Sequence, residues 1–178
     1  EKTWPTCLNE AAGYIAKRFH KSMPGYKPTP LANLSALARE LGVTNIYVKD
    51  ESARLGLNAF KVLGSSYAMG KFICQRLGLD EKTVTFEHLL SEEVRLRIGE
   101  VTFVTATDGN HGRGVAWTAE QLGQRAVVYL PRGAALRRVQ AIEETGATAI
   151  VTDVNYDDTV RLAQEAAEKN GWCLIQDT

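Results

Sequence analysis

The chain has 178 residues, 44% hydrophobic and 24% charged, and its 21 basic side chains balance 21 acidic ones. A zero net charge argues against a nucleic-acid partner, because such a partner needs a basic protein face. No apolar run approaches the roughly 20 residues of a membrane span, so no membrane partner is expected. The N-terminal residues lack the basic-then-apolar order of a signal peptide, so we expect a cytoplasmic protein.

The three cysteines are Cys7, Cys74 and Cys173, and they lie far apart with no CxxC pair. An odd number at such spacing argues against both a disulfide framework and a structural zinc site. We therefore expect no metal site. Cys74 and Cys173 lie in apolar runs, which predicts that they are core residues.

The first part of the chain predicts irregular structure with short helices. Apolar residues at helical spacing predict a helix over residues 8–21, and a proline-rich segment then ends it. A short helix is expected over residues 33–41 and a short β-rich run over residues 45–49. A polar loop follows, then a helix over residues 60–77 and a charged, helical surface segment over residues 80–100.

From residue 101 onward, strands and helices alternate. The expected strands begin at residues 101, 126, 148 and 173, and the expected helices cover residues 111–122, 134–145 and 155–170. The strand starts repeat every 22 to 25 residues, which suits one strand plus one crossover helix. The sequence therefore predicts an α/β fold with a parallel four-stranded sheet and flanking helices.

A run of polar and glycine residues, Thr105 to Gly114, follows the first of these strands and leads into a helix. Open α/β sheets bind ligands at this edge, and the free N–H groups of a helix start favour an anion. Helix capping by Asp108 or Asn110 explains a single polar residue but not the whole run. We interpret the run as a ligand-binding loop.

A second cluster surrounds Lys61, which lies between Phe60 and Val62 at the start of a predicted helix. A lysine there opposes the helix dipole, which favours acids at that end. An apolar setting at a positive helix end favours the neutral amine, the form that attacks a carbonyl to make a Schiff base. Taken alone, Lys61 is better explained as an ordinary lysine whose stem packs along a partly buried helix.

The two clusters together match a family pattern. In chain order the sequence contains PTPL at 28–31, KxE at 49–51, FKxxG at 60–64 and GNHG at 109–112. This order resembles the fold type II pyridoxal-phosphate enzymes, such as serine and threonine dehydratases. Within that family, four longer runs look like those of diaminopropionate ammonia-lyases: VKDES at 48–52, GLNAFK at 56–61, TDGNHGRGVAW at 107–117 and NYDDTVRL at 155–162.

The resemblance begins near residue 17 and implies a division of the chain. Residues 50–178 form the small α/β domain that carries the lysine and the substrate loop, and residues 1–49 the N-terminal segment of a larger, incomplete domain. The family binds the cofactor phosphate in a glycine-rich loop, whereas the glycines after the GNHG segment are isolated. We therefore expect a fragment that binds cofactor weakly and shows little activity, from a protein that is a homodimer when complete.

The resemblance also implies roles for single residues. Lys61 carries pyridoxal 5'-phosphate, Phe60 adjoins it, and Asn110 donates to the cofactor's phenolic oxygen. The substrate carboxylate lies on the loop formed by Thr107, Asp108, Gly109, Asn110 and His111. The His111 ring itself is expected to pack or to bond to backbone, and His20 and His88 to be surface residues.

Asp108 distinguishes the ammonia-lyases, because the dehydratases commonly carry a small residue there. The resemblance implies that Asp108 is a second base, opposite Lys61. A planar cofactor presents two faces, so a base on each face lets an enzyme take the α-proton from either enantiomer of an amino acid. The alternative is that Asp108 caps a helix or anchors a substrate ammonium group.

The expected activity is a carbon–nitrogen lyase of amino-acid catabolism that converts D- and L-2,3-diaminopropionate to pyruvate and ammonia. Two alternatives stay open: a serine or threonine dehydratase, and a non-catalytic binding module that keeps the fold. The arginines at 132, 137 and 138 are interpreted as part of a solvated helix face, because acids follow them in the sequence.

Overall fold

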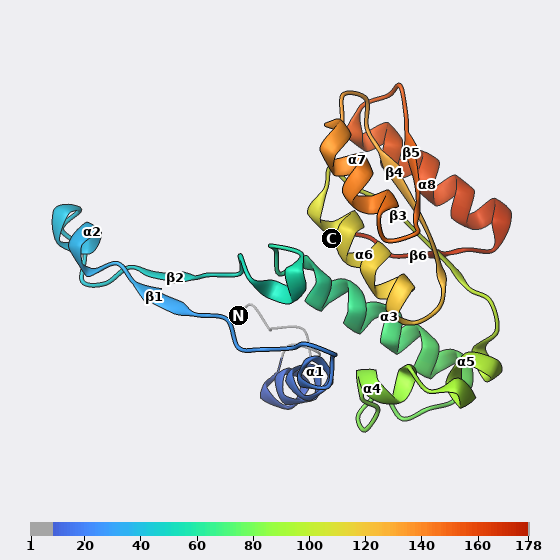
Figure 1. Ribbon diagram of the computed structural model, residues 1–178, viewed down its shortest axis with the longest axis horizontal. Helices are drawn as coiled ribbons and strands as arrows, with labels where there is room; N and C mark the ends of the chain where they lie inside the picture. The colour runs from blue at the N-terminus through green and yellow to red at the C-terminus, as the bar shows by residue number, and fades with distance from the viewer. Residues whose placement is uncertain (1–8, 178) are drawn as a thin grey trace, which may run out of the picture.

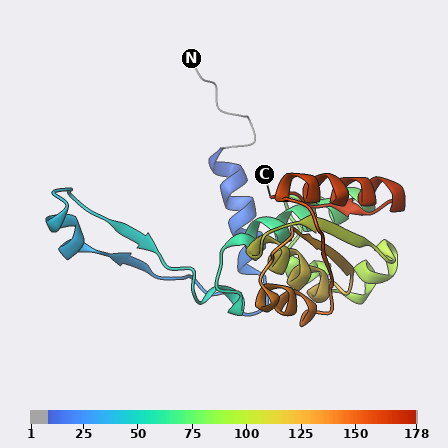
Figure 2. The same ribbon diagram turned by 90° about the horizontal axis from the view of Figure 1, so that it is seen from above.

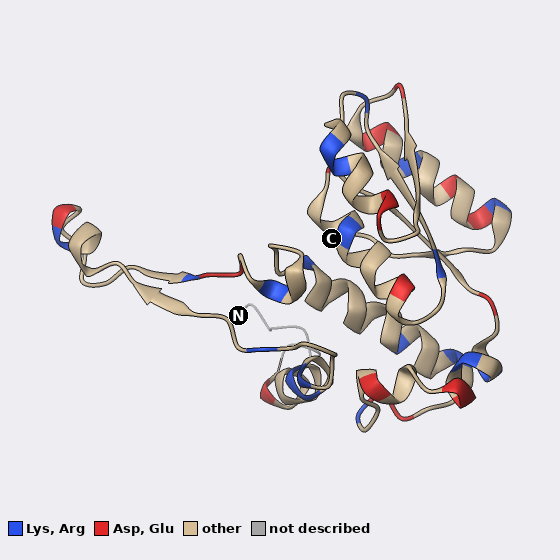
Figure 3. Ribbon diagram, in the orientation of Figure 1, with Lys and Arg blue, Asp and Glu red and all other residues tan. Residues whose placement is uncertain are grey.

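The computed structural model describes residues 9–177. Cys7 and the expected helix start at residue 8 lie outside this part. An α/β body carries a thin arm on one side, and two views at right angles show the arm reaching away from the body (Figure 1, Figure 2). Basic and acidic residues are interspersed over the helices of the body (Figure 3).

The body is built on a parallel sheet of four strands, as the sequence predicts. The strands are β3 (Thr102–Ala106), β4 (Arg125–Leu130), β5 (Thr148–Val151) and β6 (Cys173–Leu174). Their order is β5-β4-β3-β6, and every neighbouring pair is parallel. The inner strand β3 is almost wholly buried, and it contains only apolar residues and threonines.

Helices cover both faces of the sheet. The sheet-covering helices are α6 (Asn110–Gln121), α7 (Leu136–Glu143) and α8 (Tyr156–Asn170). Alternation along β3 divides the core, since Phe103 belongs to the apolar cluster with α3 and α6 whereas Val104 belongs to the cluster with α8. Asn155 caps α8 by accepting the N–H of Asp158 at 3.0 Å.

The described part of the body also contains helices outside the sheet layers, namely α1 (Glu10–Lys21), α3 (Lys61–Leu77), α4 (Phe86–Leu89) and α5 (Glu92–Ile98). Phe19 of α1 is buried, and its ring packs edge-on against the rings of Tyr67 and Phe86. Within residues 9–177, none of the helices is both long and apolar enough to cross a membrane.

The expectation that His20 is a surface residue is wrong. Its Nε2 lies 2.8 Å from the carbonyl oxygen of Leu63, and burial lowers the pKa of the imidazole. Apolar packing of α1 on α3 places the ring there.

The arm is an antiparallel ribbon of β1 (Leu31–Asn33) and β2 (Tyr47–Lys49), with α2 (Ser35–Glu40) at its tip. The sequence predicts β2 and α2 but not β1. Every side chain of the two strands is exposed, so β1 has no alternation of apolar and polar residues to reveal it. The division of the chain at residue 49 stays a prediction.

A buried arginine joins the two ends of the arm. Arg54 is 4% exposed and donates to both carboxylate oxygens of Glu51, at 2.7 and 2.9 Å. It also donates to the carbonyl of Lys27 at 2.9 Å and to the Thr29 hydroxyl at 3.0 Å. The Arg54 bond is the largest cause that lowers the pKa of Glu51 to about 2.

Candidate active site

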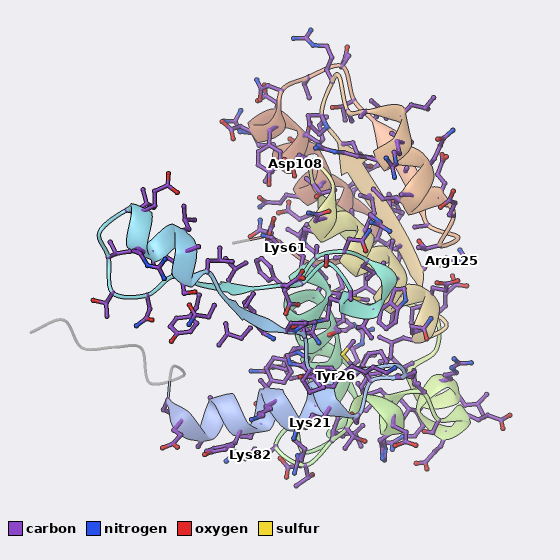
Figure 4. The ribbon with its side chains drawn as sticks, turned by 60° about the vertical axis from the view of Figure 1, so that its left-hand side comes forward. Lys21, Tyr26, Lys61, Lys82, Asp108 and Arg125 are labelled. Carbon is purple, nitrogen blue, oxygen red and sulfur yellow. The ribbon has the colours of Figure 1, made fainter. Side chains whose placement is uncertain are left out.

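The two clusters predicted from the sequence meet because α3 and α6 pack closely. A Cβ placed on Gly114 of α6 would lie 3.0 Å from both the Cα and the backbone N of Val62, and 2.9 Å from the Ser65 Oγ. Glycine at this position therefore allows the start of α3 to approach α6. Lys61 and Asp108 consequently lie along the same side of the body (Figure 4).

Lys61 is the first residue of α3, and its side chain borders a cavity of about 480 Å³. Its ammonium group pairs with the carboxylate of Asp177 and lies 5.8 Å from the centroid of the Phe60 ring. A carboxylate therefore faces the amine, which the apolar setting expected for this lysine did not include. The cavity is lined by Phe60, Lys61, Gly64, Ser65, Ala68, His111, Ile175, Gln176 and Asp177.

The predicted ligand loop lies at the carboxyl end of β3. The hydroxyl of Thr107 accepts the N–H groups of Gly109 at 2.9 Å and Gly112 at 3.2 Å. Gly109 is the N-cap residue of α6, and the Thr107 hydroxyl is the side-chain acceptor in the first turn of this helix, so neither Asp108 nor Asn110 serves as the cap. Asp108 is exposed, and within the described residues its carboxylate makes no hydrogen bond or ion pair. This carboxylate is therefore accessible to a ligand.

His111 contacts the backbone of the segment that follows β6. Its ring is buried, and its Nε2 lies 3.0 Å from the carbonyl oxygen of Ile175, so the expected bond to backbone is confirmed. Its Nδ1 lies 3.7 Å from the carboxylate of Asp177. The ring thus ties α6 to the segment that follows β6.

Two polar residues of the site were not singled out from the sequence. Asp177 follows β6 at the carboxyl edge of the sheet, where open α/β sheets bind ligands. This position in the sequence could have identified Asp177 as a candidate site residue. Tyr156 begins α8. Burial raises the pKa of the Tyr156 phenol, the charges of Asp177 and Asp108 raise it further, and Lys61 opposes them. All three charged groups therefore affect the pKa of the phenol.

A second, mainly apolar cavity of about 330 Å³ lies beside the first. Asp177 and Gln176 border both cavities, and Tyr156, Val160 and Leu174 border only the second. The segment after β6 thus separates the cavity beside Lys61 from the cavity beside α8.

Arg138 does not belong to a purely solvated face, which corrects the sequence interpretation. Its Nη1 donates to the backbone carbonyl of Asp108 at 2.6 Å. The neighbouring Arg137 is exposed and makes no hydrogen bond or ion pair within residues 9–177. One arginine of the segment therefore contacts the predicted loop.

The cysteines carry no reactive thiol within the described part. Cys74 is buried, and Cys173 is half-buried at the start of β6. Burial raises the pKa of Cys173 to about 11 and also raises the pKa of Cys74. Both are packing residues, as predicted.

The residues of the larger cavity suit pyridoxal phosphate. Lys61 offers a primary amine at the cavity wall, which is the group that binds the aldehyde of this cofactor. The small residues Gly64, Ser65 and Ala68 line the same wall and leave space beside the amine. Asn110, the first residue of α6, adds an exposed amide at the loop.

Known proteins match both the sequence and the fold. The family described as pyridoxal-phosphate dependent enzyme matches residues 23–178. The diaminopropionate ammonia-lyase of Escherichia coli (strain K12) is 53% identical over 172 residues, covering 96% of this chain and 42% of the relative. The catabolic L-threonine dehydratase of Staphylococcus aureus (strain USA300) is 27% identical over 152 residues, covering 85% of this chain and 37% of the relative.

Solved structures of the E. coli ammonia-lyase are similar to this chain in fold. The complex with D-serine has a TM-score of 0.91 at 51% identity, covering 99% of this chain and 44% of that one. The complex with an aminoacrylate-PLP azomethine reaction intermediate has a TM-score of 0.88 at 48% identity, covering 100% and 44%. The chain spans less than half the length of these relatives. On the match over residues 23–178, the chain belongs to the family of pyridoxal-phosphate dependent enzymes.

Proposed function

We propose that the protein is a pyridoxal-phosphate-dependent ammonia-lyase that acts on D- and L-2,3-diaminopropionate. The observation that carries the proposal is the placement of the Lys61 amine at the start of α3 and of the Asp108 carboxylate in the loop before α6, two helices that pack through Gly114. The 53% identity to the E. coli ammonia-lyase supports this choice of substrate over serine or threonine, since the dehydratase is only 27% identical.

Each residue has a proposed role. Lys61 holds the cofactor, Phe60 adjoins it and Asn110 donates to its phenolic oxygen. The substrate carboxylate is bound at the start of α6, where free N–H groups favour an anion. The loop that binds it comprises Thr107, Asp108, Gly109, Asn110 and His111.

Bound pyridoxal phosphate supplies an electron sink for the charge that remains when an amino acid loses its α-proton. The Lys61 amine takes that proton from one side and the Asp108 carboxylate from the other, so both enantiomers react. The Asp108 carboxylate does not cap α6, so it is accessible to take the α-proton. The D-serine complex of the E. coli relative agrees with a site that admits D-amino acids.

The overall reaction balances as two steps. Loss of the α-proton and of the β-amino group, the latter with a proton, yields ammonia and aminoacrylate. Aminoacrylate then reacts with water to give pyruvate and a second ammonia. We further propose a cytoplasmic homodimer that functions in amino-acid catabolism.

The test uses the complete gene product supplied with pyridoxal phosphate. We expect pyruvate from both enantiomers of 2,3-diaminopropionate, at a kcat/KM at least about tenfold above that for serine or threonine. Borohydride reduction followed by peptide mass analysis should place the cofactor on Lys61, and Lys61→Ala should lose the adduct. A preference for serine or threonine would show that the protein is a dehydratase. Absence of both the Lys61 adduct and turnover would show that it is a binding module.

Asp108→Asn separates the two bases. The variant should lose activity toward one enantiomer by about 10²-fold or more while the other changes far less. Equal loss for both enantiomers would show that Asp108 is not a base specific to one face.

A further inference from the structure

Arg138 reaches the substrate loop from a neighbouring helix. It lies on α7, and its Nη1 donates to the carbonyl oxygen of Asp108 at 2.6 Å. A Cβ placed on Gly109 would lie 3.3 Å from the Arg138 Cδ and 3.5 Å from its Nε, so the side chain packs directly on the glycine. Two separate contacts therefore join Arg138 to the Asp108–Gly109 peptide.

The same peptide unit is held from its other end. The Gly109 N–H donates to the Thr107 hydroxyl at 2.9 Å, while the Asp108 carbonyl accepts from Arg138. A peptide group is planar, so bonds at both ends fix its rotation about the chain. This rotation sets where the Asp108 side chain points and where the next N–H groups are directed.

We propose that Arg138 is a positioning residue that fixes the Asp108–Gly109 peptide and thereby orients the Asp108 carboxylate. The inference rests on the proposed role of Asp108 as the base for one enantiomer. Arg138 itself does not take the proton. Its loss lets the peptide rotate, and small misplacements of a reacting group lower rates strongly.

The position of Arg138 makes the inference testable without unfolding the protein. The side chain is exposed and lies outside both apolar clusters of the core. Its replacement should therefore change stability little, since substitutions of exposed polar side chains usually have small effects. Arg137, its exposed neighbour without a partner in the described part of the chain, provides a matched control.

The experiment compares Arg138→Gln, Arg138→Lys and Arg137→Gln in the complete gene product. Arg138→Gln should lower kcat/KM by about tenfold or more for the enantiomer that depends on Asp108, and by less than about threefold for the other. Arg138→Lys should keep part of the kcat/KM that Arg138→Gln loses, because the lysine amine can still donate to the Asp108 carbonyl. Arg137→Gln should match the wild type.

Amide hydrogen exchange of the 107–113 segment gives a readout independent of turnover. Exchange should accelerate in Arg138→Gln and not in Arg137→Gln. Unchanged exchange would overturn the positioning role whatever the substrate is. Faster exchange with equal loss for both enantiomers would overturn the orientation of Asp108. If the wild type releases no pyruvate from diaminopropionate, the proposed function fails, and exchange still decides whether Arg138 holds the peptide.

Discussion

The ammonium group of Lys61 pairs with the carboxylate of Asp177, which lies 116 positions later in the chain. The first of these residues begins α3 and the second follows β6, so the pair joins a helix outside the sheet to the ligand edge of the sheet. His111 approaches the same carboxylate at 3.7 Å. Asp177 therefore holds the Lys61 amine relative to the loop at the start of α6.

Loss of the Asp177 carboxylate should leave the Lys61 amine without the partner that orients it. We expect Asp177→Asn to lower kcat/KM by about tenfold or more for both enantiomers of diaminopropionate, because the Lys61 side chain loses the partner that orients it. Asp153→Asn is the matched control, since Asp153 is exposed and borders neither cavity. Equal activity of the two variants would show that the pair does not orient the amine.

The hydroxyl of Thr107 should be essential to the loop. Thr107→Val keeps the shape but leaves the N–H groups of Gly109 and Gly112 without their acceptor, at an expected cost of about 1–3 kcal/mol in the free energy of unfolding. KM for diaminopropionate should also rise. Thr107→Ser keeps the hydroxyl and should restore both properties, as measured by denaturant unfolding and steady-state kinetics. A Ser variant as impaired as the Val variant would contradict this role.

The helix contact at Gly114 should tolerate no side chain. Gly114→Ala introduces a methyl group against the Val62 backbone, and overpacking of this kind costs about 1–3 kcal/mol. The displaced start of α3 carries Lys61, so activity should fall together with the melting temperature. Gly13→Ala on α1 is the control, because a Cβ there meets nothing within 4 Å. It should be neutral or slightly stabilising.

The ion pair of Glu51 with Arg54 predicts a defined pH dependence of stability. The pKa of Glu51 in the folded protein is about 2, below its ordinary value of 4.5, so folding stabilises the carboxylate. This contribution is complete above about pH 5 and declines as the pH falls from 4.5 toward 2.

Glu51→Gln measures this contribution directly. The variant should lie about 1–3 kcal/mol below the wild type at neutral pH, and the difference should narrow on acidification. Urea unfolding at a series of pH values from neutral to about 3 gives the comparison. A difference that stayed constant over this range would contradict the assigned pKa.

The sequence predicts the body of the fold better than its arm. Each strand of the parallel sheet is rich in apolar residues, and an isolated glycine follows each crossover helix, so spacing alone identifies them. The arm offers no such pattern, since Leu31 and Tyr47 are 64% and 57% exposed. Pairing of β1 with β2 depends on backbone hydrogen bonds between distant segments, which leave no periodic signal.

The candidate site shows the same limit. Lys61 and the loop at residues 107–111 belong to local patterns and could be predicted. Asp177 joins them only through the return of the chain along β6, and Arg138 only through the packing of α7 beside the loop. Contacts made by tertiary structure between single polar residues have no local sequence signature.

The crossing of α3 and α6 at Gly114 has a consequence for ligand selection. Backbone meets backbone there, so the spacing between amine and loop is preorganised before any ligand arrives. Competing ligands then contact one fixed arrangement of helices, and their affinities differ according to how well each fills the cavity. Altered selectivity should accordingly come from exchanged side chains along the cavity, with the two helices left as they are.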